Sequence, residues 1–159
     1  MKITTIIPTY NEAENIPRLL EILFGLPLDD FNVLVIDDNS RDGTGQLVDE
    51  LVNKYPGRLS VIHRPGKLGL GSAYITGFQH LLKGDSQAIG QMDADFSHEP
   101  AKVLELVNAL ESCDVAIGSR YVPGGSVDKD WPYWRKWLSG FGNLYARTIL
   151  GVRYADLTA

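Results

Sequence analysis

Short apolar runs alternate with amphipathic segments along most of the chain. The apolar runs are rich in β-branched residues, which is typical of buried strands. The expected strands cover residues 3–7, 32–36, 59–63, 88–92 and 114–117. Between them, apolar residues recur at the spacing of one helical face. The expected helices cover residues 13–24, 44–55, 73–82 and 101–110.

This alternation of strands and helices predicts an α/β fold, with a mainly parallel sheet and helices on both of its faces. The chain has 159 residues, which is the size of one domain, and it contains no internal repeat or linker. We therefore expect a single domain over residues 1–159. Beyond Ser119 the pattern changes, and the aromatic and basic segment 131–151 predicts one helix or two short ones.

The composition is that of an ordinary globular domain, with 44% hydrophobic and 22% charged residues. A net charge of -5 argues against a nucleic-acid-binding protein, which usually has a basic excess. The single cysteine, Cys113, fits a reducing compartment such as the cytoplasm. No apolar run is long enough to predict a membrane-spanning helix.

Polar side chains gather where the expected strands end. In parallel α/β sheets, ligands bind outside the carboxyl ends of the strands. The residues at these ends are Glu12, Asp37, Asp38, Asp93, Asp95 and Arg120. So many carboxylates at one edge would repel each other unless a cation or a donor-rich ligand lies between them. The sequence therefore predicts a binding site at this edge.

Asp93 and Asp95 give the sharpest signal, because both carboxylates can face one side as the chain leaves a strand. Hard oxygen ligands suit Mg²⁺ or Mn²⁺, which also bind diphosphate oxygens. The alternative is a solvated acidic turn or a helix cap before Pro100. For Asp37 and Asp38, hydrogen bonds to a nucleotide compete with a turn capped by an aspartate side chain.

Other motifs are ambiguous. The glycine-rich segment 66–72 follows the third expected strand, which favours a helix-capping turn over a dinucleotide-binding loop. His98 lies beside the acidic pair and is a candidate for substrate contact. Segment 131–137 combines tryptophans with Arg135 and Lys136. It either meets a phosphate beside a lipid-facing surface or packs its tryptophans on the core.

Four motifs in order give the chain a family resemblance: Pro-Thr-Tyr-Asn-Glu at 8–12, Ile-Asp-Asp-Asn-Ser-Arg-Asp-Gly-Thr at 36–44, Gln-Met-Asp-Ala-Asp-Phe-Ser-His-Glu-Pro at 91–100 and Gly-Ser-Arg-Tyr at 118–121. Together they resemble glycosyltransferase family 2, whose Rossmann-like GT-A fold transfers sugars from nucleotide diphosphates. More narrowly, they are similar to dolichyl- and polyprenyl-phosphate mannosyltransferases. The resemblance covers nearly the whole chain.

The resemblance implies an inverting transfer of a hexose, typically mannose from GDP-mannose, to a polyprenyl or dolichyl phosphate, with Mg²⁺ or Mn²⁺. The residues it places around the nucleotide are Pro8, Tyr10, Glu12, Ile36 and Asp38. The diphosphate and metal would be held by Asp93, Ala94 and Asp95, and Arg120 would lie near the sugar and phosphate. Arg135 matches a basic position that meets the acceptor phosphate. Asp95, Arg120 and Arg135 are thus the expected catalytic residues.

The chain departs from the family at two places. The third metal-ligand position, often glutamine in the family, is Ser97 here. The family motif that begins at Asp156 normally continues, whereas this sequence ends at Ala159, so we expect the domain to lack its C-terminal part.

The alternatives are a family 2 enzyme with another donor or acceptor, or a non-catalytic nucleotide-sugar-binding domain. A sugar-phosphate nucleotidyltransferase is disfavoured, because residues 8–12 lack its basic glycine-rich loop. We also expect peripheral contact with the cytoplasmic face of a membrane through Trp131, Trp134 and Trp137.

Overall fold

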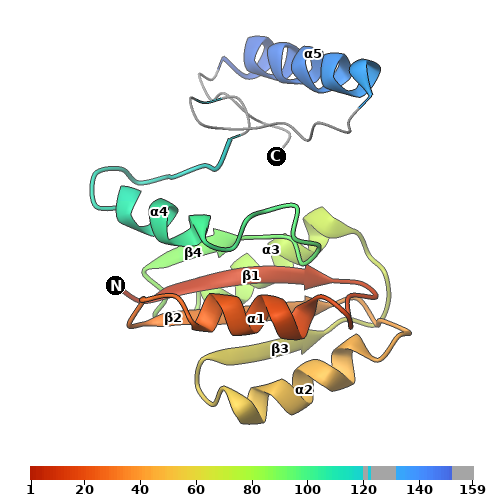
Figure 1. The fold of residues 1–159 in the computed structure, drawn as a ribbon, viewed down its shortest axis with the longest axis vertical. Coiled ribbons are helices and arrows are strands. Elements are labelled where there is room, and N and C mark those ends of the chain that lie inside the picture. The colour runs from red at the N-terminus through yellow and green to blue at the C-terminus, as the bar shows by residue number, and fades with distance from the viewer. Residues whose placement is uncertain (120–121, 123–131, 152–159) are drawn as a thin grey trace. The chain divides into compact units, whose positions relative to one another are not determined.

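The computed structural model describes residues 1–119, 122 and 132–151, with the backbone alone for Arg135 and Lys136 (Figure 1). The chain forms two compact units, residues 1–105 and residues 106–159. The first unit contains the sheet and the candidate site, and the second contains the long C-terminal helix.

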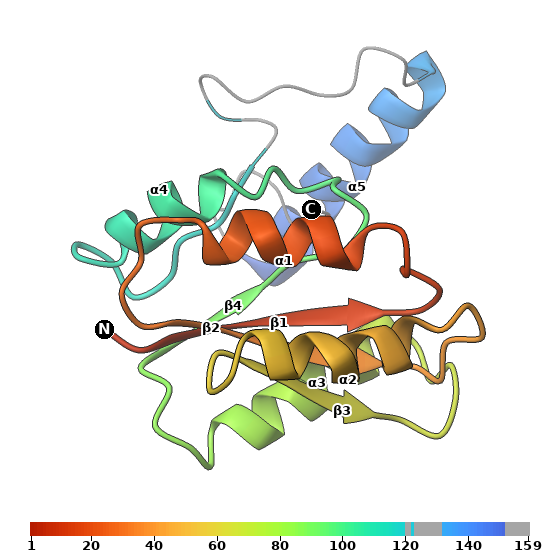
Figure 2. The same ribbon diagram turned by 60° about the horizontal axis from the view of Figure 1, so that its bottom comes forward.

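The first unit is built on a four-stranded parallel sheet. Its strands are β1 (Ile3–Thr9), β2 (Phe31–Asp37), β3 (Leu59–His63) and β4 (Ala88–Gln91), in the order β3-β2-β1-β4. The register aligns the last residues of β1, β2 and β3, since Thr9 lies opposite Asp37 and Asp37 lies opposite His63. The carboxyl ends of the strands therefore lie side by side at one edge (Figure 2).

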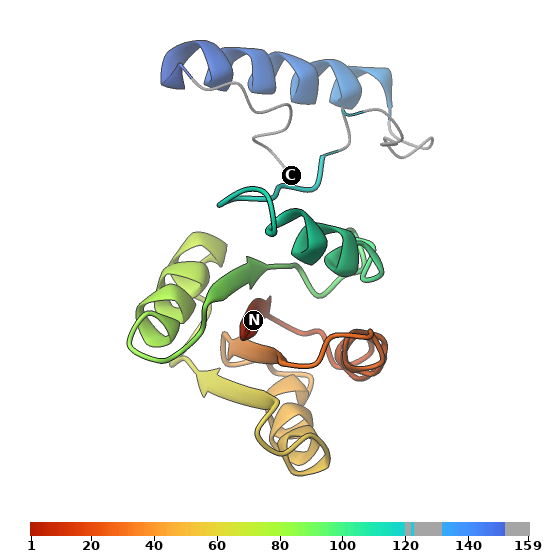
Figure 3. The same ribbon diagram turned by 90° about the vertical axis from the view of Figure 1, so that its left-hand side faces the viewer.

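Helices cover both faces of this sheet, as the alternating pattern predicted. α1 (Ile16–Phe24) and α2 (Thr44–Lys54) lie on one face, and α3 (Leu70–Leu81) lies on the other (Figure 3). This follows from right-handed crossovers, because the chain reverses its direction across the sheet between β3 and β4. α4 (Lys102–Ala109) and α5 (Tyr133–Leu150) complete the described helices.

Two layers of apolar side chains hold the helices on the sheet. On one face, α1 buries the stripe whose spacing predicted the helix, namely Ile16, Leu19, Leu20 and Leu23, all at 0% exposure. On the other face, α3 packs on a cluster shared by β1 and β2. Its buried members are Ile6, Leu34, Ile36, Ala73 and Leu81.

The helix starts follow local backbone chemistry. α1 begins at Ile16, three residues later than expected, after a turn in which the Glu12 carbonyl accepts hydrogen bonds from the Asn15 and Ile16 amides. α2 begins after Gly43 and α3 after Gly69, whose φ angles are 89° and 96°. Glycine adopts this left-handed backbone without a steric cost.

The prediction of a fifth strand at 114–117 is wrong. No strand pairing involves this segment within residues 1–119, and Val115 and Ile117 are 60% and 44% exposed. A run of only three apolar residues is a weak signal, because a strand also needs a neighbour that satisfies its backbone groups.

In the second unit, segment 133–150 forms one helix, α5, which ends at Gly151 with φ 64°. It is one of the two arrangements expected from the sequence. Trp134 and Trp137 are 67% and 70% exposed. None of the helices in the described part of the chain is long and apolar enough to cross a membrane.

Candidate functional site

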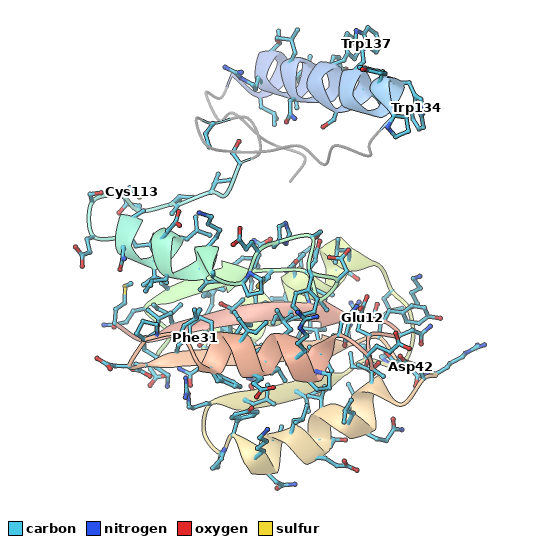
Figure 4. The ribbon with its side chains drawn as sticks, in the orientation of Figure 1. Glu12, Phe31, Asp42, Cys113, Trp134 and Trp137 are labelled. Carbon is cyan, nitrogen blue, oxygen red and sulfur yellow. The ribbon has the colours of Figure 1, made fainter. Side chains whose placement is uncertain are left out.

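The predicted site residues that the structure describes gather at the carboxyl edge of the sheet. Figure 4 shows Glu12 and Asp42 at this edge, in the loops that follow β1 and β2, while Phe31 marks the opposite edge where β2 begins. Asp93 and Asp95 follow β4, which pairs with β1. The strand order thus brings together motifs that lie about 80 residues apart in the sequence.

The loop after β1 is fastened to the loop after β2. The Thr9 hydroxyl donates to Asp37 Oδ1 at 3.2 Å. The Asn11 amide donates to Ser40 Oγ at 2.9 Å, and the Arg41 amide donates to Asn11 Oδ1 at 2.9 Å. Asn11 has a positive φ of 61°, which asparagine tolerates better than most residues.

Further along these loops, Thr44 and Asp42 complete the connection. The Glu12 amide donates to Thr44 Oγ1 at 2.9 Å, and the Ala13 amide donates to Asp42 Oδ2 at 3.0 Å. Thr44 in turn donates from its hydroxyl to Asp42 Oδ1 at 2.6 Å. The Glu12 carboxylate accepts a hydrogen bond from Asn15 at 2.8 Å. These bonds fix the loop that the family resemblance assigns to the nucleotide.

Asp37 is satisfied within the protein. It is 2% exposed and accepts hydrogen bonds from Thr9, from the Ser40 amide at 3.2 Å and from the Ser40 hydroxyl. The turn alternative is therefore confirmed for this carboxylate.

Asp38 forms a buried ion pair with Arg64, and its Oδ2 accepts a hydrogen bond from the Leu68 amide at 3.1 Å. Protein donors therefore compensate both carboxylates at the end of β2, so these two need no cation between them. The assignment of Asp38 to the nucleotide stays a prediction.

Asp93 and Asp95 are held differently, because in the described residues each carboxylate accepts hydrogen bonds from only one other residue. The Tyr74 hydroxyl donates to Asp93 Oδ1 at 2.7 Å, and the Ser97 amide donates to Asp95 Oδ1 at 2.9 Å. Asp93 is half-buried and Asp95 is exposed. The Asp93 amide donates to His98 Nδ1 at 3.2 Å, so that nitrogen is the unprotonated acceptor on the ring.

The hydrogen bonds around Asp95 favour the negatively charged form of its carboxylate. Burial acts to raise the pKa of Asp95, but hydrogen bonds from Ser97 and the nearby His98 outweigh it and lower that pKa. Burial, together with the hydrogen bond to Asp93, raises the pKa of the Tyr74 hydroxyl far above its ordinary value. The Tyr74 hydroxyl is therefore protonated near neutral pH, as its hydrogen bond to Asp93 requires.

The donor chemistry at this turn fits a hard divalent cation bound together with a ligand. The described residues contain no cluster of three or more histidine, cysteine or acidic side chains arranged for a metal. The carboxylates of Asp93 and Asp95 would instead supply part of a coordination sphere, which diphosphate oxygens and water would complete for Mg²⁺ or Mn²⁺. Ser97 is exposed and already engaged with Asp95, so its part as third ligand stays a prediction.

The other predicted contacts fall into three groups. Pro8 and Tyr10 are half-buried, and the Lys67 ammonium lies 4.2 Å from the Tyr10 ring centre. Ile36 and Ala94 are 0% and 3% exposed, so almost no surface of either residue reaches solvent, and their contact with a nucleotide stays a prediction. Arg120 and the side chain of Arg135 lie outside the described residues.

Sequence reasoning missed two residues that organise the site, Tyr74 and Arg64. Tyr74 lies within an expected helix, and Arg64 lies just before the glycine-rich segment, so neither position indicated a role in the site. Arg64 donates to Ser72 Oγ at 2.7 Å and to the Gly69 carbonyl at 3.1 Å. The glycine-rich segment thus leads directly into α3, which begins after Gly69, and Arg64 holds it there.

A cavity of about 230 Å³ lies beside these residues, at the ends of β2 and β3 next to α2. Its lining does not include the acidic turn at Asp93. The lining residues are Asp37, Asn39, Ser40, Gly45, Gln46, Asp49, His63 and Arg64.

Comparison with known proteins shows which family the chain resembles in sequence and fold. The chain is 47% identical over 156 residues to the polyprenol monophosphomannose synthase of Mycolicibacterium smegmatis, and this covers 97% of the chain and 58% of that protein. It is 44% identical over 160 residues to the undecaprenyl-phosphate mannosyltransferase of Micrococcus luteus, which covers 100% of the chain and 64% of that protein. The chain thus spans about 58–64% of the length of these relatives.

Among solved structures, the chain is similar to the mannosyltransferase PcManGT of Pyrobaculum calidifontis, in complex with GDP-Man and Mn²⁺. The TM-score is 0.52 at 30% identity, over 59% of this chain and 27% of that one. The sequence pattern of glycosyl transferase family 2 matches residues 4–156. The chain therefore belongs to glycosyl transferase family 2 and has its GT-A fold.

Proposed function

We propose that this chain is the donor-binding part of an inverting glycosyltransferase that moves mannose from GDP-mannose to a polyprenyl phosphate with the help of Mg²⁺ or Mn²⁺. The observation that carries the proposal is the contrast among the acidic residues at the carboxyl edge. Asp37 and Asp38 are compensated by several protein donors, whereas in the part of the chain that the structure describes Asp93 and Asp95 each accept hydrogen bonds from one other residue only. The names of the two mannosyltransferase relatives support mannose and a lipid phosphate as substrates.

The chemistry follows from the substrates. A phosphate acceptor is anionic near neutral pH, so it attacks without strong help from a general base. The main requirements are charge neutralisation on the departing diphosphate and alignment of the attacking oxygen. A divalent cation, when bound, supplies that neutralisation. Asp93 and Asp95 would hold it, and Arg120 and Arg135 would orient the sugar phosphate and the acceptor by charge-assisted hydrogen bonds.

Calorimetric titration with GDP in the presence of Mn²⁺ tests the donor site. We expect Asp95→Asn to weaken Mn²⁺-dependent GDP binding by about 10-fold or more, because it removes one of few protein ligands. Asp29→Asn is the matched control, since Asp29 is exposed and its carboxylate accepts no hydrogen bond in the described residues. Equal binding by Asp95→Asn and the unaltered chain would sink the assignment.

Transfer itself is tested by incubating the chain, and a longer chain that includes the residues following 159, with GDP-mannose and polyprenyl phosphate and measuring the product mass. Formation of mannosyl polyprenyl phosphate supports the proposal. Donor binding without transfer in both chains would favour a non-catalytic nucleotide-sugar-binding domain instead.

We further propose peripheral contact with the cytoplasmic face of a membrane, where a polyprenyl phosphate would be reached. The support is the exposure of Trp134 and Trp137 on α5, together with the stacking of Trp137 on Phe141 at 5.4 Å between ring centres. Co-sedimentation with anionic vesicles should be lost when both tryptophans are replaced by alanine. Failure of the unaltered chain to co-sediment would contradict this part of the proposal.

A further inference from the structure

Tyr74 fixes the orientation of the Asp93 carboxylate. It lies near the start of α3, which covers the face of the sheet opposite α1 and α2 (Figure 3). Its hydroxyl donates to Asp93 Oδ1 at 2.7 Å across the carboxyl end of β4. Asp93 Oδ2 accepts no hydrogen bond within the described part of the chain. One oxygen is thus held by the protein while the other remains available.

The ring that carries this hydroxyl is itself held by the core. Tyr74 and Phe78, one helical turn apart, both pack against the cluster that contains Ile6 and Ile36. Phe78 packs against the same cluster with a phenyl ring, so contact with this cluster does not require a hydroxyl. Because dense packing sets the place of the Tyr74 ring, it also sets the place of its hydroxyl. The hydroxyl therefore has a role beyond filling space.

We propose that Tyr74 is a positioning residue for the donor site, which holds Asp93 so that its second oxygen faces the cation bound with the donor diphosphate. This inference rests on the function proposed above. A hydrogen bond to one oxygen restricts rotation of the carboxylate and still leaves a ligand atom for the cation. Groups that orient metal ligands in this way typically contribute about 10- to 100-fold to metal affinity.

The test compares Tyr74→Phe with Tyr55→Phe in the full chain. Both changes remove a phenolic oxygen from a half-buried ring. Tyr55 packs on Phe24 with ring centres 4.5 Å apart, and its hydroxyl has no partner among the described residues. Mn²⁺ affinity is measured by the electron paramagnetic resonance signal of free Mn²⁺ at saturating GDP. We expect Tyr74→Phe to weaken Mn²⁺ binding by about 10-fold or more and Tyr55→Phe to leave it unchanged.

A double variant separates positioning from a general effect on folding. In the Asp93→Asn background, Tyr74→Phe should cause no further loss of Mn²⁺ affinity, because the ligand that it positions is gone. A full additional loss there, or Mn²⁺ binding by Tyr74→Phe equal to that of the unaltered chain, would overturn the role of Tyr74 alone. Absence of Mn²⁺ binding by the unaltered chain would overturn the metal site of the proposed function, and this inference with it.

Discussion

The guanidinium of Arg64 and the carboxylate of Asp38 form a buried ion pair where β3 and β2 end, with side chains only 6% and 8% exposed. Arg64 also binds Ser72 Oγ and the Gly69 carbonyl. One side chain therefore connects the ends of neighbouring strands to the first turn of α3.

Arg64→Ala should destabilise the chain by about 3–5 kcal/mol, because it leaves the Asp38 charge buried without a partner. The measurement is urea unfolding at pH 7. Lys102→Ala is the control, since it removes an exposed pair with Glu105 at 2.6 Å and should cost less than about 1 kcal/mol. Similar losses in the free energy of unfolding for the two variants would show that the buried ion pair stabilises the chain no more than the exposed one.

Gly77→Ala should destabilise the chain although alanine is the better helix former. A Cβ at this position would lie 2.8 Å from Ile6 Cδ1 and Cγ2, within the closed contact between α3 and β1. Overpacking costs about 1–3 kcal/mol and outweighs a helix-propensity gain of about 1 kcal/mol. Gly71→Ala, where no atom lies within 4 Å, should stabilise the chain by up to about 1 kcal/mol in the same unfolding assay. Stabilisation by both changes would contradict the close contact.

Thr44→Val should cost about 1–3 kcal/mol, because it replaces the acceptor of the Glu12 amide by a methyl group and leaves that amide unpaired. Thr44 is fully buried, so water has no access to substitute for the hydroxyl. Thr44→Ser keeps the hydroxyl and should retain more stability than the valine variant. Chemical denaturation of the unaltered chain, Thr44→Ser and Thr44→Val checks this order. A smaller loss of stability for Thr44→Val than for Thr44→Ser would refute it.

Asp42 should make the free energy of unfolding of the chain depend on pH. Burial acts to raise its pKa, but hydrogen bonds from Thr44 and the Ala13 amide outweigh it and hold the pKa below the ordinary value of 3.8. A group with a depressed folded pKa stabilises the protein above its unfolded pKa and loses that effect as the pH falls through the folded value. Asp42→Asn should therefore lower the urea midpoint at pH 7, and the difference should shrink below about pH 3.8.

Asp29→Asn controls for the removal of a negative charge from the surface and should leave the urea midpoint unchanged at both pH values. A gap between Asp42→Asn and the unaltered chain that stays constant from pH 7 to pH 3 would contradict the linkage.

The sheet and its helices could be predicted from the sequence because burial imposes periodic patterns. The stripe of Ile16, Leu19, Leu20 and Leu23 in α1 is such a pattern. The expected start of the second helix at residue 44 is also confirmed, since α2 begins at Thr44 directly after Gly43, whose left-handed backbone favours glycine. The prediction of a strand at 114–117 was wrong because a short apolar run does not show whether a neighbouring strand pairs with it.

The candidate site could be predicted only in part. Strand ends in a parallel sheet converge, so the sequence located Asp37, Asp38, Asp93 and Asp95 at one edge. It did not show which of these carboxylates the protein compensates, because that depends on long-range partners. The contact between Tyr74 and Asp93 spans 19 positions, and helical spacing does not distinguish this tyrosine from an ordinary core aromatic. The single domain over residues 1–159 stays a prediction.

The contacts of Arg64 also affect the thermodynamics of ligand binding. Ordering a flexible side chain during association costs about 0.5–1.5 kcal/mol. At this edge Asp38, Arg64 and Ser72 restrain one another, and Tyr74 restrains Asp93. Their conformational entropy is therefore lost during folding rather than when a ligand arrives. A nucleotide that binds here meets immobilised groups, and its affinity is not reduced by the need to order them.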